Sequence, residues 1–201
     1  MFKRYISVLL VPLCLIALFL CGCSEGRPPE DSIVEDLYTR AKIIIEDHCS
    51  SETSMRASYM FSINVSNDTV QIDGNEYYVT DLDYDIVHDT FATVFAGEQL
   101  DSFLDAFYYN NDGCAYMIFV GGKSGVGTAN VEAEYVGEKD GMYNYHINYC
   151  LDYSYDNEYG ELVEDLVPCE DDISVVLTDD GYRIADGLTS LYSGQSSYWL
   201  N

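Results

Sequence analysis

The sequence predicts an α+β protein, with N-terminal helices packed on a twisted antiparallel β-sheet. After position 32, apolar residues recur at three- and four-residue steps, which is the period of one helical face. From Tyr108 onward the period changes to two, which is typical of half-buried strands. Short turns such as Asp179-Asp180-Gly181 separate the later strands, and short connections favour antiparallel neighbours.

Residues 1–22 have the three parts of a bacterial lipoprotein signal peptide. Two basic residues near the start precede the apolar stretch 6–20. This stretch ends in Leu20-Cys21-Gly22-Cys23, which has the pattern of a cleavage site. The alternative is a transmembrane anchor, which needs roughly 20 apolar residues. This stretch is shorter and is interrupted by Pro12. We therefore predict a lipoprotein. We expect the signal peptide to be cleaved before Cys23, and Cys23 then to carry acyl chains that include palmitate.

The rest of the chain is interpreted as a tether, 23–30, followed by one extracytoplasmic domain, 31–201. Gly26, Pro28 and Pro29 suit a short extended linker. About 170 residues are the size of a single domain. Through lipid on Cys23, the membrane is the first predicted partner. The predicted location is the extracytoplasmic face of the bacterial cell membrane.

The charge of the chain is strongly acidic. Its 201 residues include 9 basic and 35 acidic ones, for a formal net charge of −26. Phosphate contacts need clusters of Lys and Arg, so the composition argues against nucleic-acid binding. The simplest interpretation is a solvated acidic surface, and attraction of a basic partner is the alternative. With 19 tyrosines, the chain can bury a core, unlike a disordered acidic tail.

The first helix is expected from Ser32 to about Cys49. Ser32-Ile33-Val34-Glu35 has the pattern of a capping box, in which the Glu35 side chain reaches back to the Ser32 amide. The apolar face of this helix consists of Val34, Leu37, Ala41, Ile44 and His48. The following segment, 55–65, is ambiguous between helix and strand.

A hairpin and two helical segments are expected next. Stretches 69–72 and 76–79 flank Asp73-Gly74, a pair that favours a two-residue hairpin turn. Asp83 or Asp85 would then cap a helix. Its expected buried residues are Ile86, Val87, Phe91, Val94 and Phe95. Beyond Gly97, Leu100, Phe103, Leu104 and Phe107 form the apolar side of the second segment.

The remaining elements are expected to be strands. They cover residues 114–120, 130–136, 142–153, 162–169, 173–177 and 182–185. In the third of these, Tyr143, Tyr145, Ile147 and Tyr149 share one face. His146 alternates away from that face, so we expect it to be exposed.

Four cysteines remain in the mature domain: Cys49, Cys114, Cys150 and Cys169. In an exported protein they allow two disulfides with three connectivities. Because Cys150 and Cys169 fall in consecutive predicted strands, we favour Cys150–Cys169 together with Cys49–Cys114. Four free thiols are the alternative. No pair has the spacing of a zinc site.

A glycine-rich loop follows the 114–120 strand. It consists of Gly121, Gly122, Lys123, Ser124, Gly125, Val126, Gly127 and Thr128. The phosphate-binding motif requires a Gly where Met117 stands, and a helix after the loop where the pattern predicts a strand. A plain connecting loop is one interpretation. The other is an exposed loop that enters a partner's groove.

No motif predicts catalysis, a metal or a cofactor. Asp81, Asp83 and Asp85 are spaced like the start of a calcium loop, but Ile86 stands where the loop needs Gly. A solvated turn with a helix cap explains them better. A nucleophilic pair of His146 with Cys114 or Cys150 has no local support, so we do not expect an enzyme.

The order of the parts resembles the IseA family of DL-endopeptidase inhibitors. The resemblance covers about residues 69–186. It rests on Tyr77-Tyr78-Val79, the helical 86–95 segment ending in Val94-Phe95, Asp112-Gly113-x-x-Tyr116, the glycine-rich loop and Gly181-Tyr182-Arg183-Ile184. It implies an extracytoplasmic α+β domain that binds and blocks cysteine endopeptidases of peptidoglycan stem peptides. It also implies that the loop 121–128 contacts the partner.

A second interpretation uses the same layout. A helix cradled by a curved sheet is also found in cystatin-like and nuclear-transport-factor-like domains, which serve as ligand-binding or interaction modules. A deep tyrosine-lined cavity between helix and sheet would favour this interpretation over an endopeptidase inhibitor.

Overall fold

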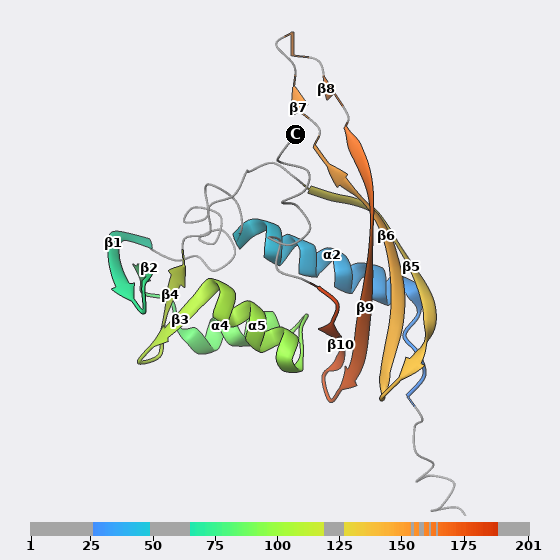
Figure 1. Cartoon of the computed structure of the whole chain (residues 1–201), viewed down its shortest axis with the longest axis horizontal. Helices are drawn as coiled ribbons and strands as arrows, with labels where there is room; N and C mark the ends of the chain where they lie inside the picture. The colour runs from blue at the N-terminus through green and yellow to red at the C-terminus, as the bar shows by residue number, and fades with distance from the viewer. Residues whose placement is uncertain are drawn as a thin grey trace, which may run out of the picture.

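The computed structural model describes residues 26–48, 65–118, 127–153, 155–156, 159–160, 162–163 and 165–188. This part of the chain forms two four-stranded antiparallel sheets and three helices (Figure 1). The predicted α+β class is confirmed. The arrangement differs in two respects. Within the described residues one helix precedes the strands and two lie among them, and the strands divide between two sheets.

The small sheet consists of two hairpins in the order β1-β2-β4-β3. Asp73-Gly74 joins β1 (Val65–Ile72) to β2 (Asn75–Thr80), and Asp112-Gly113 joins β3 (Tyr108–Asn111) to β4 (Cys114–Ile118). All four turn residues have φ between 51° and 93°. Two consecutive positive φ angles define the type I′ turn that Asp-Gly favours, so the first predicted hairpin is confirmed.

The large sheet has the order β10-β9-β6-β5. Its strands are β5 (Gly127–Lys139), β6 (Met142–Asp152), β9 (Leu166–Thr178) and β10 (Gly181–Asp186). On β6, Tyr143, Tyr145, Ile147 and Tyr149 are all buried on the inner face, as predicted. β9 is one continuous strand, although the sequence predicted two with a break after Cys169.

A narrow arm extends the large sheet. β7 (Tyr155–Asp156) and β8 (Leu162–Val163) pair beyond the ends of β6 and β9, and Figure 1 shows them projecting away from the rest of the fold.

Helices α4 (Tyr84–Ala92) and α5 (Gly97–Phe107) lie between the two sheets (Figure 1). Asp83 caps α4 by accepting a hydrogen bond from the Asp85 amide at 2.8 Å. Val87 and Phe91 face the core as predicted, but Ile86 is 54% exposed and is not part of the buried face. α5 contacts β10 of the large sheet and also β3 and β4 of the small sheet, so it joins the two.

Helix α2 (Asp31–His48) packs on the inner face of the large sheet beside β5. Val34, Leu37, Ala41 and Ile44 are buried, as the helical period predicted. The predicted capping box is wrong. The helix begins at Asp31, the Glu30 carbonyl accepts the Ile33 amide at 2.9 Å, and Glu35 points to the sheet instead.

Residues 26–30 lie against the large sheet. The Tyr145 hydroxyl donates to the Pro29 carbonyl at 2.6 Å, and the Tyr182 hydroxyl donates to the Arg27 carbonyl at 2.7 Å. At Gly26 a Cβ would lie 2.3 Å from the Tyr143 hydroxyl oxygen, so a larger residue here would require the Tyr143 side chain to shift. These five of the eight residues of the predicted tether are therefore part of the folded domain. Residues 1–25, including Cys23, lie outside the described residues.

No helix within the described residues is long and apolar enough to cross a membrane.

Candidate functional site

The outward face of the small sheet is apolar at its centre. The register places Val70 beside Tyr77, Tyr77 beside Ile118, and Tyr116 beside Tyr109 on this side of the sheet. Alternation adds the remaining members. We call this surface the tyrosine face, and it consists of Val70, Ile72, Tyr77, Val79, Tyr109, Tyr116 and Ile118.

The tyrosine face is separate from the hydrophobic core. Tyr77 is only 7% exposed, yet it does not belong to the contiguous cluster of buried residues that contains the helices. Its ring packs on the Tyr109 ring, with 5.5 Å between centroids. Tyr109 itself is 36% exposed. The tyrosine face is therefore an apolar surface that is partly open to solvent.

The opposite side of the same sheet packs on the helices. Tyr108, Ala115 and Met117 are buried there, and the Phe91 ring of α4 meets the Tyr108 ring edge-on at 6.0 Å. Antiparallel sheets normally have one face on the core and one polar face in water. The small sheet departs from this rule because both of its faces are apolar.

The outward face of the large sheet is polar. His146 of β6 lies in its middle, with Nδ1 2.8 Å from Asp172 Oδ1 and Nε2 3.3 Å from Glu170 Oε2. Glu134 of β5 is its cross-strand neighbour on the other side. The hydrogen bond to Asp172 and the charges of these carboxylates raise the pKa of His146, against a smaller opposing effect of burial. The prediction that His146 lies opposite the tyrosines of β6 is confirmed.

A buried polar network lies between α2 and the inner face of the large sheet. Lys42 Nζ is 3.1 Å from Asp171 Oδ2, and the Tyr38 hydroxyl donates to the same oxygen at 2.5 Å. Lys42 is 8% exposed and lies over the Tyr149 ring, 4.6 Å from its centroid. Cation–π contact and ion pairing together compensate for burying the ammonium group.

The tyrosines of this network are held neutral. Burial, and then the hydrogen bond to Asp171, raise the pKa of Tyr38 far above its usual value. Burial and the Asp171 charge raise the pKa of Tyr149 in the same way. Burial also raises the pKa of the adjacent Cys169 thiol, so this cysteine has little thiolate at neutral pH. These groups hold α2 on the sheet and do not form an activated nucleophile.

Most of the predicted partner loop lies outside the described residues. Gly121, Gly122, Lys123, Ser124, Gly125 and Val126 fall there. Gly127 and Thr128 open β5, where they pair with Asp152 and Leu151. The loop is therefore followed by a strand, as predicted, and not by the helix that a phosphate-binding loop requires.

The predicted Cys150–Cys169 disulfide is wrong. Tyr149, not Cys150, is the cross-strand partner of Cys169, and Cys150 pairs with Pro168. Successive side chains on a strand point to opposite faces, so Cys169 lies on the inner face and Cys150 on the outer face. Both thiols are free, and so is Cys114, which is exposed. Cys49 lies outside the described residues, so the partner proposed for Cys114 is not placed.

The other candidate constellations do not assemble. His146 and Cys150 are four residues apart on β6, about 13 Å along a strand, which is too far for a nucleophile–base pair. Cys114 belongs to the other sheet. Within the described ranges, no three His, Cys, Asp or Glu side chains are placed to hold a metal ion. Asp83 acts as a helix cap, as the simpler interpretation predicted.

Comparison with known protein families and with curated proteins found no matching family model and no matching sequence.

Proposed function

We propose that this protein is a lipid-anchored extracytoplasmic binding protein that restrains a cell-wall endopeptidase. The observation that carries the proposal is the tyrosine face. An apolar surface on the outward side of a sheet, next to otherwise acidic surroundings, is typical of a protein-docking site.

The tyrosine face ends close in sequence to the loop that the family resemblance singles out. Ile118 is the last residue of β4 and pairs with Tyr77, and the glycine-rich segment begins three residues later in the sequence, at Gly121. The resemblance to endopeptidase inhibitors supplies the class of partner, and the signal peptide with Cys23 supplies the compartment.

The alternative, a small-ligand module of the cystatin-like or nuclear-transport-factor-like kind, has less support. It requires space between α2 and the large sheet. The Tyr38 and Tyr149 rings pack on each other there at 5.4 Å, and the Lys42–Asp171 pair lies beside them. These side chains occupy the position that a ligand would need.

The proposal is tested with the full-length chain in detergent and a panel of purified cysteine endopeptidases that cut peptidoglycan stem peptides. We expect dose-dependent inhibition of at least one enzyme. Replacing Tyr109 by alanine should weaken inhibition about tenfold, since aromatic residues at an interface often carry such losses. Lack of both inhibition and binding across the panel would sink the proposal.

A matched control is offered by Val136 of β5, which is 66% exposed and also apolar. Val136→Ala removes apolar surface from the large sheet and should leave inhibition unchanged. If both variants weaken inhibition equally, the tyrosine face is not the docking site.

A further inference from the structure

The two edges of the large sheet are closed by specific contacts. At β5, Glu35 of α2 accepts the Ala133 amide at 3.3 Å, and two register shifts interrupt the strand. At β10, Ile184 donates its amide to the Val94 carbonyl and accepts the Ala96 amide, at 2.8 and 2.9 Å. Such devices prevent a further strand from pairing with an edge.

The β1 edge of the small sheet has one register shift, between Val65 and Thr69, and pairs regularly with β2 from Thr69 to Ile72. Ile72 and Asn75 flank the two-residue turn, so they form the hydrogen-bonded closing pair, and the next such pair is Val70–Tyr77. The alternate residues, Thr69 and Gln71, therefore direct their backbone amide and carbonyl groups away from β2. Figure 1 shows β1 as the outermost strand at this end of the molecule.

We propose that β1 binds an extended segment of the partner protein as an additional strand, with apolar residues alternating with Lys or Arg. The proposal deepens the proposed function, since it names the surface and the partner chemistry of the same site. Strand addition is a common mode of peptide recognition, in which backbone hydrogen bonds give affinity and alternate side chains give specificity.

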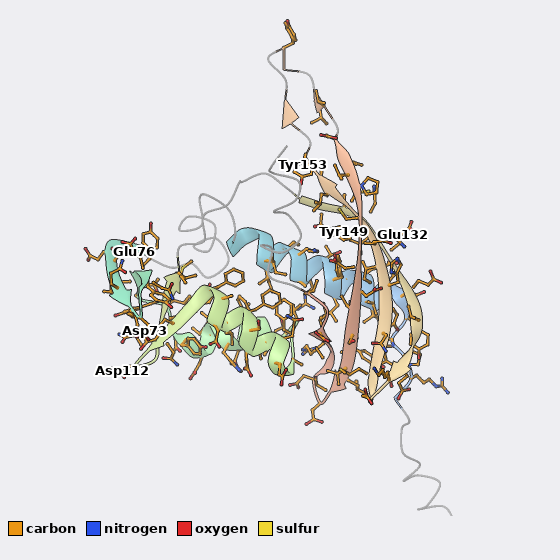
Figure 2. All side chains as sticks on the ribbon, viewed as in Figure 1. Asp73, Glu76, Asp112, Glu132, Tyr149 and Tyr153 are labelled. Carbon is orange, nitrogen blue, oxygen red and sulfur yellow. The ribbon has the colours of Figure 1, made fainter. Side chains whose placement is uncertain are left out.

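The side chains of the hairpin define what such a segment contains. On one side of β1, Val70 and Ile72 extend the tyrosine face, so the apolar side chains of an added strand would continue that surface. On the other side lie Thr69 and Gln71, with the exposed carboxylate of Glu76 behind them. Figure 2 shows Glu76 and Asp73 at separate positions on this side of the molecule. Lys or Arg side chains would pair with these carboxylates.

The charge of the chain argues against a second copy as the occupant. Two molecules with a net charge of −26 repel each other, and the β1 hairpin has no basic residue to offset this. A basic segment, by contrast, gains from the same field.

The test measures binding of a short synthetic peptide of alternating valine and lysine to the full-length chain. A peptide of equal composition, with valines and lysines in two blocks, reports attraction by charge alone. We expect the alternating peptide to bind about tenfold more tightly, and its binding to slow hydrogen exchange at the Thr69 and Gln71 amides. Equal binding of the two peptides would overturn the proposal.

Two changes isolate the backbone contribution. Gln71→Pro removes an outward amide without removing a β1–β2 hydrogen bond, and should weaken the alternating peptide about tenfold. Gln71→Ala keeps the amide and should bind as the wild type does. If the proline variant does not fold, the alternating peptide methylated on alternate amide nitrogens gives the same test on the wild-type protein. Undiminished binding of the methylated peptide would contradict strand addition.

Two further results separate this inference from the proposed function. Peptide binding without inhibition of any endopeptidase would leave strand addition supported and would remove the proposed partner. Inhibition of an endopeptidase that Gln71→Pro does not change would leave the proposed partner supported and would remove strand addition at β1. A wild-type dimer that this variant converts to a monomer would show that β1 pairs with a second copy, which overturns the choice of partner.

Discussion

The two sheets cover their inner faces in similar ways and differ on their outer faces. The large sheet presents His146 among carboxylates, whereas the small sheet presents tyrosines and aliphatic side chains. The edges of the two sheets differ as well. In the large sheet, α2 covers the β5 edge and the segment after α4 covers the β10 edge. The large sheet therefore has the polar outer face that is usual for a sheet in water. The small sheet has the apolar outer face that is typical of a protein-docking surface.

The largest expected effect concerns α5, which contacts both sheets. Phe103 is fully buried between Phe95 and Phe107, with ring centroids 4.6 and 6.2 Å away. Phe103→Ala should lower the free energy of unfolding by about 4 kcal/mol. Ile86→Ala, on the exposed side of α4, should cost about 0.5 kcal/mol or less. Urea unfolding followed by NMR at Tyr77 and Ile147 should give one midpoint for both sheets. Separate midpoints would mean that the sheets unfold independently.

The next effect compares two adjacent aspartates on opposite faces of β9. Asp171→Ala leaves the buried Lys42 ammonium without its partner and should cost about 3 kcal/mol. Asp172→Ala changes an exposed contact and should cost about 0.5 kcal/mol or less. Denaturant titration of the two variants measures both values. Equal losses would show that the inner network contributes no more than the surface pair.

A smaller effect is expected at the β5 edge of the large sheet, which α2 covers. Glu35→Ala removes the acceptor of the Ala133 amide and should cost about 1 kcal/mol. It should also increase self-association, because it exposes an edge amide of the large sheet. Light scattering against protein concentration checks the second outcome, with Glu132→Ala on the outward face as the control. An unchanged oligomeric state in both variants would show that Glu35 does not guard this edge.

The smallest effect is a pH dependence at His146. Its pKa is raised in the folded state by Asp172, Glu170 and Glu134, so the protonated form stabilises the fold. This contribution is complete below the unfolded pKa, about 6.5, and is lost as pH rises through the folded value. NMR titration should give a His146 pKa above 6.5, and Asp172→Asn should lower it. A pKa at or below 6.5 in the wild type would contradict the prediction.

The local elements were predictable because their signals are local. The Asp-Gly turn required two positive φ angles, and the spacing of Val34, Leu37, Ala41 and Ile44 defined one helical face. The capping box failed although its pattern was complete, because Glu35 makes a contact with β5, which is distant in sequence. The division into two sheets depends on pairing between distant strands, which no local pattern specifies.

The break predicted in β9 shows how a local signal can mislead. Glu170-Asp171-Asp172 resembles a solvated turn, yet it lies in the middle of a strand. The strand continues because Asp171 pairs with the Lys42 ammonium and accepts a hydrogen bond from Tyr38 on the inner face. On the outer face, Glu170 and Asp172 contact His146. Lys42 is not among the five positions of the predicted apolar face, so the helical pattern did not indicate this pairing.

The tyrosine face was missed for a related reason. A tyrosine-rich strand taken alone does not reveal whether both of its faces are apolar. In β4, Ala115 and Met117 face the helices, and Tyr116 and Ile118 face outward. Only the register of four strands shows that the outward residues form one surface.

The contact of residues 26–30 with the large sheet limits the distance between a lipid anchor on Cys23 and the folded domain. With lipid on Cys23, only three peptide units separate the anchor from Gly26, and they span at most about 11 Å. Gly26 lies at Tyr143, while the β7–β8 arm extends from the other end of β6. The domain would thus stand on the bilayer by one end, with the arm pointing outward. Its search for a partner would be confined to two dimensions, and only molecules close to the membrane would be within reach.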